Sequence, residues 1–118
     1  IFAPCAIGGI LNRDTIPQLK ACVVAGGANN QLLTEEDGAR LHARGILYAP
    51  DFVANGGGII NCATEILKIE DRERFVAEKL TALDATMKRI LNQAKAADIS
   101  PDAAAIATVR EIMARPAA

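Results

Sequence analysis

Three short apolar segments, each followed by a loop of small and amide residues, constrain the fold of this chain most. The segments are Ile1–Ala6, Ala21–Ala25 and Ile46–Ala49. Each is continuously apolar rather than alternating, which is typical of strands covered on both faces of a parallel sheet. Helical signals separate them, so the sequence predicts an α/β fold with three short parallel strands joined by right-handed crossovers.

Capping residues mark the helices between these strands. Asp14 or Thr15 can cap a short helix that has Pro17 near its start. Thr34 can cap a second helix, which should end just before Gly45.

The second half of the chain is predicted to be helical throughout. A helix from Ile59 to about Ile69 is followed by a long amphipathic helix, and Ser100 with Pro101 begins a last helix. We expect part of this helical surface to contact other regions or another subunit, and the tail Ala114–Ala118 to fray. The long helix has an apolar seam of Val76, Leu80, Leu83, Met87, Ile90 and Ala94, and the last helix an apolar face of Ile106, Val109, Ile112 and Met113.

The run from Ile46 to Gly58 predicts a ligand site. It reads as a buried strand, a tight loop and a helix that opens on the three glycines 56–58. Glycines let the backbone approach a ligand, and the first N–H groups of a helix are free to bind it. Asn55 adds an amide that both donates and accepts. The alternative is a mobile turn, but all three loops follow strands, and ligands bind at that edge of parallel sheets.

Charge and cysteine content restrict the possible partners. The formal net charge is −1, so no basic surface favours nucleic acid or anionic lipid, and no apolar run is long enough to span a membrane. Three cysteines, an odd number, indicate reduced thiols in the cytoplasm, and we expect Cys22 to lie in the core. The chain lacks an initiator Met and begins on a strand-like segment, so we expect a piece of a larger protein.

The sequence offers binding groups but no evident acid–base machinery. His42 is the only histidine and lies beside Arg40 and Arg44, which favours an exposed structural role over catalysis. No paired ligands mark a metal site. Asp51 is either a functional residue or an ordinary turn residue after Pro50. We therefore expect half of an active site, with no catalytic residue and no metal in this chain.

Three motifs resemble the C-terminal part of the Glu/Leu/Phe/Val amino-acid dehydrogenases, particularly the leucine, valine and phenylalanine branch. They are Phe2–Gly9, Ala25–Asn30, and Tyr48–Asp51 followed by residues 55–58. The resemblance implies the second half of a Rossmann-like parallel sheet, followed by C-terminal helices. Residues 1–69 would form part of an NAD-binding domain, and residues 70–118 would pack on it or on neighbouring regions. It also implies oxidative deamination of an L-amino acid to a 2-oxo acid, with hydride passed to NAD.

The resemblance also assigns residues to the site. It places Asn29 at both the cofactor and the substrate carboxylate, and Asn55 near the nicotinamide. The catalytic lysine and aspartate of the family, and its GxGxxG loop, have no match in this chain, so we expect the isolated chain to be inactive. The loops that would border the nicotinamide half of the cofactor comprise Ala6, Ile7, Gly8, Gly27, Ala28 and Asn29.

Two residues bear on specificity. Ile59 and Cys62 are three residues apart, hence on one helical face, and the resemblance places them in the substrate side-chain pocket. Neither could pair with a side-chain carboxylate, and burying that charge unpaired would cost several kcal/mol, which disfavours glutamate. The β-branched Ile59 should narrow the pocket against a phenyl ring, which favours leucine or valine.

The same residues also fit two other functions. One is a phenylalanine dehydrogenase, and the other is a non-catalytic module that binds a nucleotide or mediates assembly. If the protein is a branched-chain amino-acid dehydrogenase, we expect a cytoplasmic homo-oligomer that binds NAD and converts a small amino acid to its 2-oxo acid.

Overall fold

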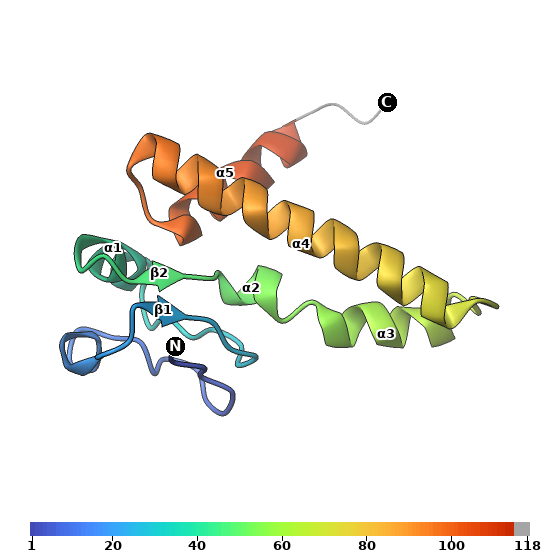
Figure 1. Ribbon diagram of the computed structural model, residues 1–118, viewed down its shortest axis with the longest axis horizontal. Coiled ribbons are helices and arrows are strands. Elements are labelled where there is room, and N and C mark those ends of the chain that lie inside the picture. Colours follow the sequence, from blue (N-terminus) through green and yellow to red (C-terminus); the bar gives the residue numbers. More distant parts are fainter. Residues whose placement is uncertain (115–118) are drawn as a thin grey trace.

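The structure, a computed structural model, describes residues 1–114 and has an α/β fold with a small sheet at one end (Figure 1). The long helix α4 begins beside α3, at the end far from the sheet, and runs back past α2 towards the sheet, after which α5 turns back beside it. The expected fraying of the tail after Ala114 lies outside the described residues. In chain order the elements are η1 (Ile16–Gln18), β1 (Val23–Val24), α1 (Glu35–Ala43), β2 (Leu47–Tyr48), α2 (Asp51–Ala54), α3 (Gly57–Ile66), α4 (Arg72–Ala97) and α5 (Pro101–Ala114).

The sheet is parallel, as predicted, but has two strands rather than three. Strand β1 pairs with β2 in the register Val23–Leu47 and Val24–Tyr48. The segment before them adds one isolated parallel bridge, between Phe2 and Val24. Pro4 has no N–H to continue that ladder, which is why the bridge does not extend into a strand.

Only one face of this sheet is covered by the described residues. The side chains of Val24 and Tyr48 are fully buried, whereas Leu47, on the opposite face, is 45% exposed. The described residues thus supply the expected cover on one face of the sheet only. Cys22, expected in the core, is exposed because it lies just before β1, outside the packed region. The core on the covered face consists of Leu11, Ile16, Val24, Leu41, Ile46 and Tyr48.

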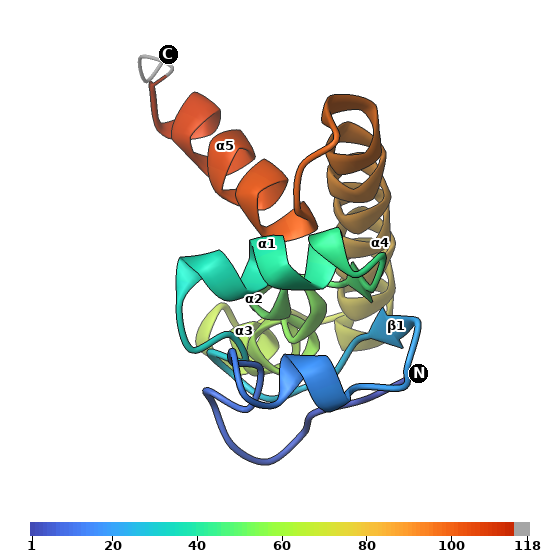
Figure 2. The same ribbon diagram turned by 90° about the vertical axis from the view of Figure 1, so that its left-hand side faces the viewer.

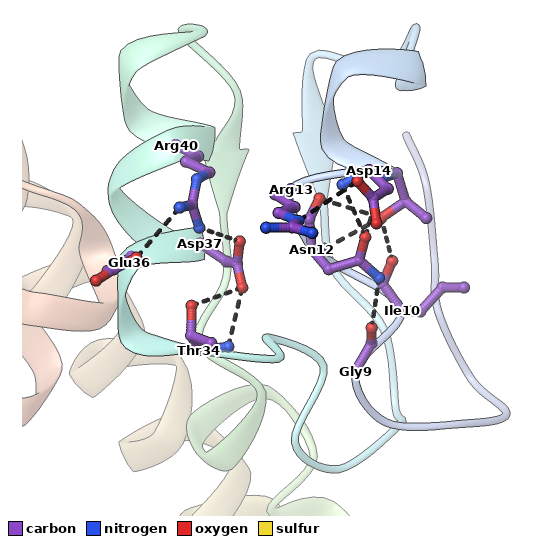
Figure 3. A network of polar contacts seen from close by, with 10 residues as sticks. Gly9, Ile10, Asn12, Arg13, Asp14, Thr34, Glu36, Asp37 and Arg40 are labelled. Carbon is purple, nitrogen blue, oxygen red and sulfur yellow. Dashed lines mark hydrogen bonds and ion pairs between the residues drawn. The ribbon is translucent and has the colours of Figure 1, made fainter.

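Helix α1 begins and ends at the residues predicted for it. The Thr34 backbone N–H and hydroxyl both donate to one carboxylate oxygen of Asp37 at 2.9 Å, and Arg40 donates to the other at 2.7 Å (Figure 3). Burial raises the pKa of Asp37, but these hydrogen bonds and the charge of Arg40 outweigh it, so the pKa lies below its ordinary value. Gly45, with φ +67°, ends the helix as a left-handed glycine.

The short predicted helix is a single 3-10 turn, η1, which Thr15 precedes as N-cap. Arg44, at the end of α1, donates to the Ile16 and Leu19 carbonyls and ties η1 to α1. Figure 2 shows α1 between α5 and this N-terminal segment.

The helices around the glycine run differ from the prediction. Helix α2 occupies the segment expected to be a tight loop, and α3 ends at Ile66 rather than Ile69. Gly56 lies between them with an ordinary helical φ of −66°. A Cβ there would lie 3.4 Å from both methyls of Leu83, so this glycine also allows α4 to pack closely.

The predicted long helix and last helix are both present, but α5 packs through small residues. Ala104 and Ala105 are buried against α4, while Met113 is 80% exposed. The predicted apolar face is thus not the packed face, because alanines allow closer approach of the two helices. Helix α5 also contacts α1 and β2. Within residues 1–114, no helix is both long and apolar enough to cross a membrane.

Candidate functional site

Two asparagines from separate loops meet beyond the carboxyl ends of the strands. The Asn55 Nδ2 donates to Asn29 Oδ1, which joins the loop after β1 to the turn after α2. This bond leaves the Asn29 amide nitrogen as a donor and the Asn55 amide oxygen as an acceptor for a ligand. The sequence placed amides at both positions, and the fold brings them into direct contact.

A hollow of about 440 Å³ lies beside this pair. Of the predicted substrate residues, Ile59 lines it and is 75% exposed, so its side chain is available to a ligand. Cys62 is exposed on the next turn of α3 and does not line the hollow. The lining residues are Asn29, Asn30, Asp51, Phe52, Asn55, Gly56 and Ile59.

The N-terminal loop lies against the loop that carries Asn29. The Gly9 N–H donates to the Asn30 carbonyl at 2.8 Å. A Cβ on Gly8 would lie 2.9 Å from the Asn29 and Asn30 carbonyl oxygens, so only glycine fits there. Ala6 and Ile7, in the same loop, are exposed. Two of the predicted cofactor loops are therefore side by side.

Two adjacent glycines in the second loop, Gly26 and Gly27, differ in the space around their backbone. A Cβ on Gly26 would lie 2.1 Å from the Pro4 carbonyl oxygen, so the chain crosses itself there without room for a side chain. A Cβ on Gly27 would meet nothing within 4 Å. Gly27 thus offers open backbone, whereas the Ala28 side chain is buried and can present only its backbone.

Two buried polar residues lie behind these loops: Gln31, which was not singled out from sequence, and Asp51, for which a functional and a turn role were both left open. Gln31, fully buried, donates through Nε2 to the carbonyls of Gly26 at 2.8 Å and Ala28 at 2.9 Å. The Asp51 carboxylate accepts the Gln31 backbone N–H at 3.1 Å. The available signal was the position of Gln31 directly after the glycine–asparagine loop and before Leu32 and Leu33.

Helix α5 brings a further carboxylate to this region. Asp102 and Asp51 both line a hollow between α1, α2 and α5. Burial, followed by repulsion from Asp51 and Glu35, raises the pKa of Asp102. Burial, together with the Asp51 charge, also raises the pKa of Tyr48. This meeting of residues 51 apart in sequence depends on how α5 folds back.

The remaining candidates lie elsewhere. His42 contacts Asp98 at the end of α4, with 3.1 Å between Nε2 and Oδ1. This contact agrees with the structural role expected for His42. Among residues 1–114, no group of three or more His, Cys, Asp or Glu side chains is arranged to hold a metal ion.

Comparison with known proteins gives a consistent family match. Residues 1–116 match the model of the Glutamate/Leucine/Phenylalanine/Valine dehydrogenase family. The chain is 50% identical over 99 residues to a phenylalanine dehydrogenase of Bacillus thermotolerans, covering 84% of this chain and 25% of that protein. It is 48% identical to a leucine dehydrogenase of Geobacillus stearothermophilus, covering 80% of this chain and 25% of that protein. It is also 48% identical to a valine dehydrogenase of Streptomyces coelicolor, covering 98% of this chain and 32% of that protein.

The fold gives the same result. The crystal structure of L-tryptophan dehydrogenase from Nostoc punctiforme superposes with a TM-score of 0.83 at 40% identity, covering 93% of this chain and 33% of that one. The chain therefore spans about a quarter to a third of the length of these relatives.

Proposed function

We propose an amino-acid dehydrogenase function for this protein, starting from the premise that the chain belongs to the glutamate/leucine/phenylalanine/valine dehydrogenase family. The reaction is the NAD-dependent oxidative deamination of a branched-chain L-amino acid to its 2-oxo acid. The observation that carries the proposal is the Asn29–Asn55 contact, since it unites two amides beside a hollow at the strand ends.

We assign residues 1–69 to part of an NAD-binding domain and the segment from residue 70 onwards, whose described helices are α4 and α5, to a region that packs on it. The parallel pair β1–β2, extended by the Phe2 bridge, supports placing these strands in the second half of a Rossmann-like sheet. The contacts of α4 with α2 and α3, and of α5 with α1, support one packed unit.

The residues present fit the nicotinamide end of NAD. Its carboxamide needs one donor and one acceptor, which Asn29 Nδ2 and Asn55 Oδ1 supply. The open backbone at Gly27 gives a flat ring room to approach, and the adjoining loop contributes Ala6, Ile7 and Gly8. When bound, NAD supplies the hydride acceptor.

The residues of this chain bind and orient in this scheme, and they move no proton. The Asn29 amide also binds the substrate carboxylate, and Asn55 keeps the Asn29 amide turned towards the hollow. The five lysines of the chain are all exposed, so none is desolvated enough to act as a base. Acid–base catalysis therefore belongs to residues outside this chain.

We assign the substrate side chain to the surface of Ile59 and Cys62 on α3. Both are apolar and exposed, so they favour an uncharged aliphatic side chain over glutamate. Exposed Ile66 and Leu67 at the end of α3 support association with another copy. The 50% identity to a phenylalanine dehydrogenase makes phenylalanine the second candidate substrate.

Initial rates of NAD reduction test the proposal. The full-length protein should reduce NAD with leucine or valine at a higher kcat/KM than with phenylalanine, and with glutamate only weakly. A preference for phenylalanine would replace the branched-chain assignment. An absence of reduction with every amino acid would refute the dehydrogenase function.

A further inference from the structure

We infer that Gln31 is a positioning residue that sets the conformation of the cofactor loop at residues 26–29. This inference rests on the proposed function, because it concerns how the loop is held for NAD. The side-chain hydrogen bonds of Gln31 go to the backbone of the loop that carries Asn29, and not to either asparagine side chain.

The side-chain amide of Gln31 donates two hydrogen bonds to the backbone of the loop at residues 26–29. Its two N–H groups are both used, one on the Gly26 carbonyl and one on the Ala28 carbonyl. These carbonyls flank Gly27, so the two bonds fix the residues on either side of the open backbone. The loop is thus held on both sides of Gly27, directly before Asn29, which lines the hollow.

The orientation of this amide follows from its surroundings. Its oxygen, Oε1, is buried without a hydrogen-bond partner among the described residues. Turning the amide over would place Oε1 against the carbonyl oxygens of Gly26 and Ala28. The observed orientation avoids this repulsion between oxygens. A buried unpartnered oxygen is costly, and the two donated bonds offset it.

Asp51 connects Gln31 to the second asparagine. Its Oδ2 accepts the Gln31 backbone N–H at 3.1 Å, and its Oδ1 accepts the Phe52 N–H at 2.9 Å at the start of α2. Asp51 is 8% exposed, so these bonds are shielded from water. Because α2 leads directly to Asn55, the Asp51 carboxylate fixes the position of the Asn29 loop relative to the turn that carries Asn55.

Two substitutions at position 31 in the full-length enzyme test this role. Gln31→Met keeps the length of the side chain but removes both donors, and Gln31→Glu places a carboxylate against two carbonyl oxygens. Gln18→Glu is the matched control, since Gln18 also donates to a backbone carbonyl, that of Asp14 at 2.9 Å, but on the exposed surface.

Three measurements distinguish positioning from general stabilisation. We expect the Kd of NADH and the KM of NAD to rise roughly ten- to a hundred-fold in both variants, because two buried carbonyls lose their donors. We expect kcat per folded enzyme to change less than about three-fold. Amide exchange of the peptide covering residues 25–31 should accelerate in the cofactor-free enzyme, while Gln18→Glu matches wild type throughout.

The outcomes separate this inference from the proposed function. If wild type binds no NADH, the proposed function fails. If wild type binds NADH and folded Gln31 variants bind it equally well, the positioning role is refuted and the function stands. A lower apparent kcat with unchanged KM, or failure of both variants to fold, would assign Gln31 a purely structural role and also overturn the inference.

Discussion

The two neighbouring glycines of the cofactor loop should respond oppositely to the same substitution. Gly26→Ala places a methyl group 2.1 Å from the Pro4 carbonyl oxygen and 2.6 Å from the Pro4 nitrogen. Both are backbone atoms, so the N-terminal segment must move. In Gly27→Ala the added methyl meets nothing within 4 Å.

The structure sets the size of the two effects on stability. Displacing Pro4 strains the crossing by about 1–3 kcal/mol. It also breaks the hydrogen bond from the Ala28 N–H to the Pro4 carbonyl, at 3.0 Å, for about 1–2 kcal/mol more. We therefore expect Gly26→Ala to lower the free energy of unfolding by about 2–5 kcal/mol. Gly27→Ala should leave it unchanged or raise it by up to about 1 kcal/mol, because alanine restricts the unfolded chain.

Among variants that fold, Gly27→Ala should weaken cofactor binding more than Gly26→Ala does. The methyl in Gly27→Ala occupies backbone surface that we assign to the nicotinamide, so the Kd of NADH should rise at least about ten-fold, or about 1.4 kcal/mol. Urea unfolding and NADH fluorescence titration of the full-length protein measure the two quantities. Equal stability of both variants would refute the chain crossing, and wild-type NADH affinity in Gly27→Ala would refute the assignment of that surface.

Three other predictions concern the pocket, the buried carboxylate of Asp102 and the isolated chain. Ile59→Ala should shift the ratio of kcat/KM for leucine over phenylalanine by about ten-fold or more towards phenylalanine, since a pocket methylene contributes about 1–3 kcal/mol; an unchanged ratio in initial-rate assays would remove Ile59 from the pocket. Asp102→Asn should raise Tm at neutral pH, because burial and then Asp51 and Glu35 raise the pKa of Asp102 and its ionised form destabilises the folded state. The gain should vanish as pH falls through the raised pKa to the unfolded value of about 3.9, and a gain independent of pH would contradict this. Residues 1–118 alone should give no amino-acid-dependent NAD reduction, since no lysine in them is buried, and turnover above a blank without amino acid would disprove it.

Local signals in the sequence were enough for the bounds of α1 and for the loops that meet at the site, but they did not reveal α2. The Thr34 cap and Gly45 delimit α1 because both act within a few residues of themselves. The amides of Asn29 and Asn55 were located from their places after apolar segments, and the parallel pairing then brings them together.

Tertiary contacts decided what the sequence could not predict. Helix α5 packs through alanines rather than through Ile112 and Met113. The shortening of the strand expected at Ile1–Ala6 is different, because Pro4 is visible in the sequence and its missing N–H was the local signal that ends the ladder. Gln31 reads as an ordinary polar residue until the loop is seen folded over its amide. Such long-range closures leave no periodic pattern in the sequence.

The paired asparagines are the centre of the proposed site, and the kcat/KM values of full-length variants at these two positions test their roles most directly. Asn29→Ala removes a hydrogen bond to a charged carboxylate as well as to the cofactor, which amounts to roughly 1.5–3 kcal/mol, or about ten- to a hundred-fold in kcat/KM. Asn55→Gln keeps the amide and shifts it by one methylene, so its loss should be smaller. Equal losses, a larger loss in Asn55→Gln, or wild-type kcat/KM in Asn29→Ala would contradict the roles assigned to this pair.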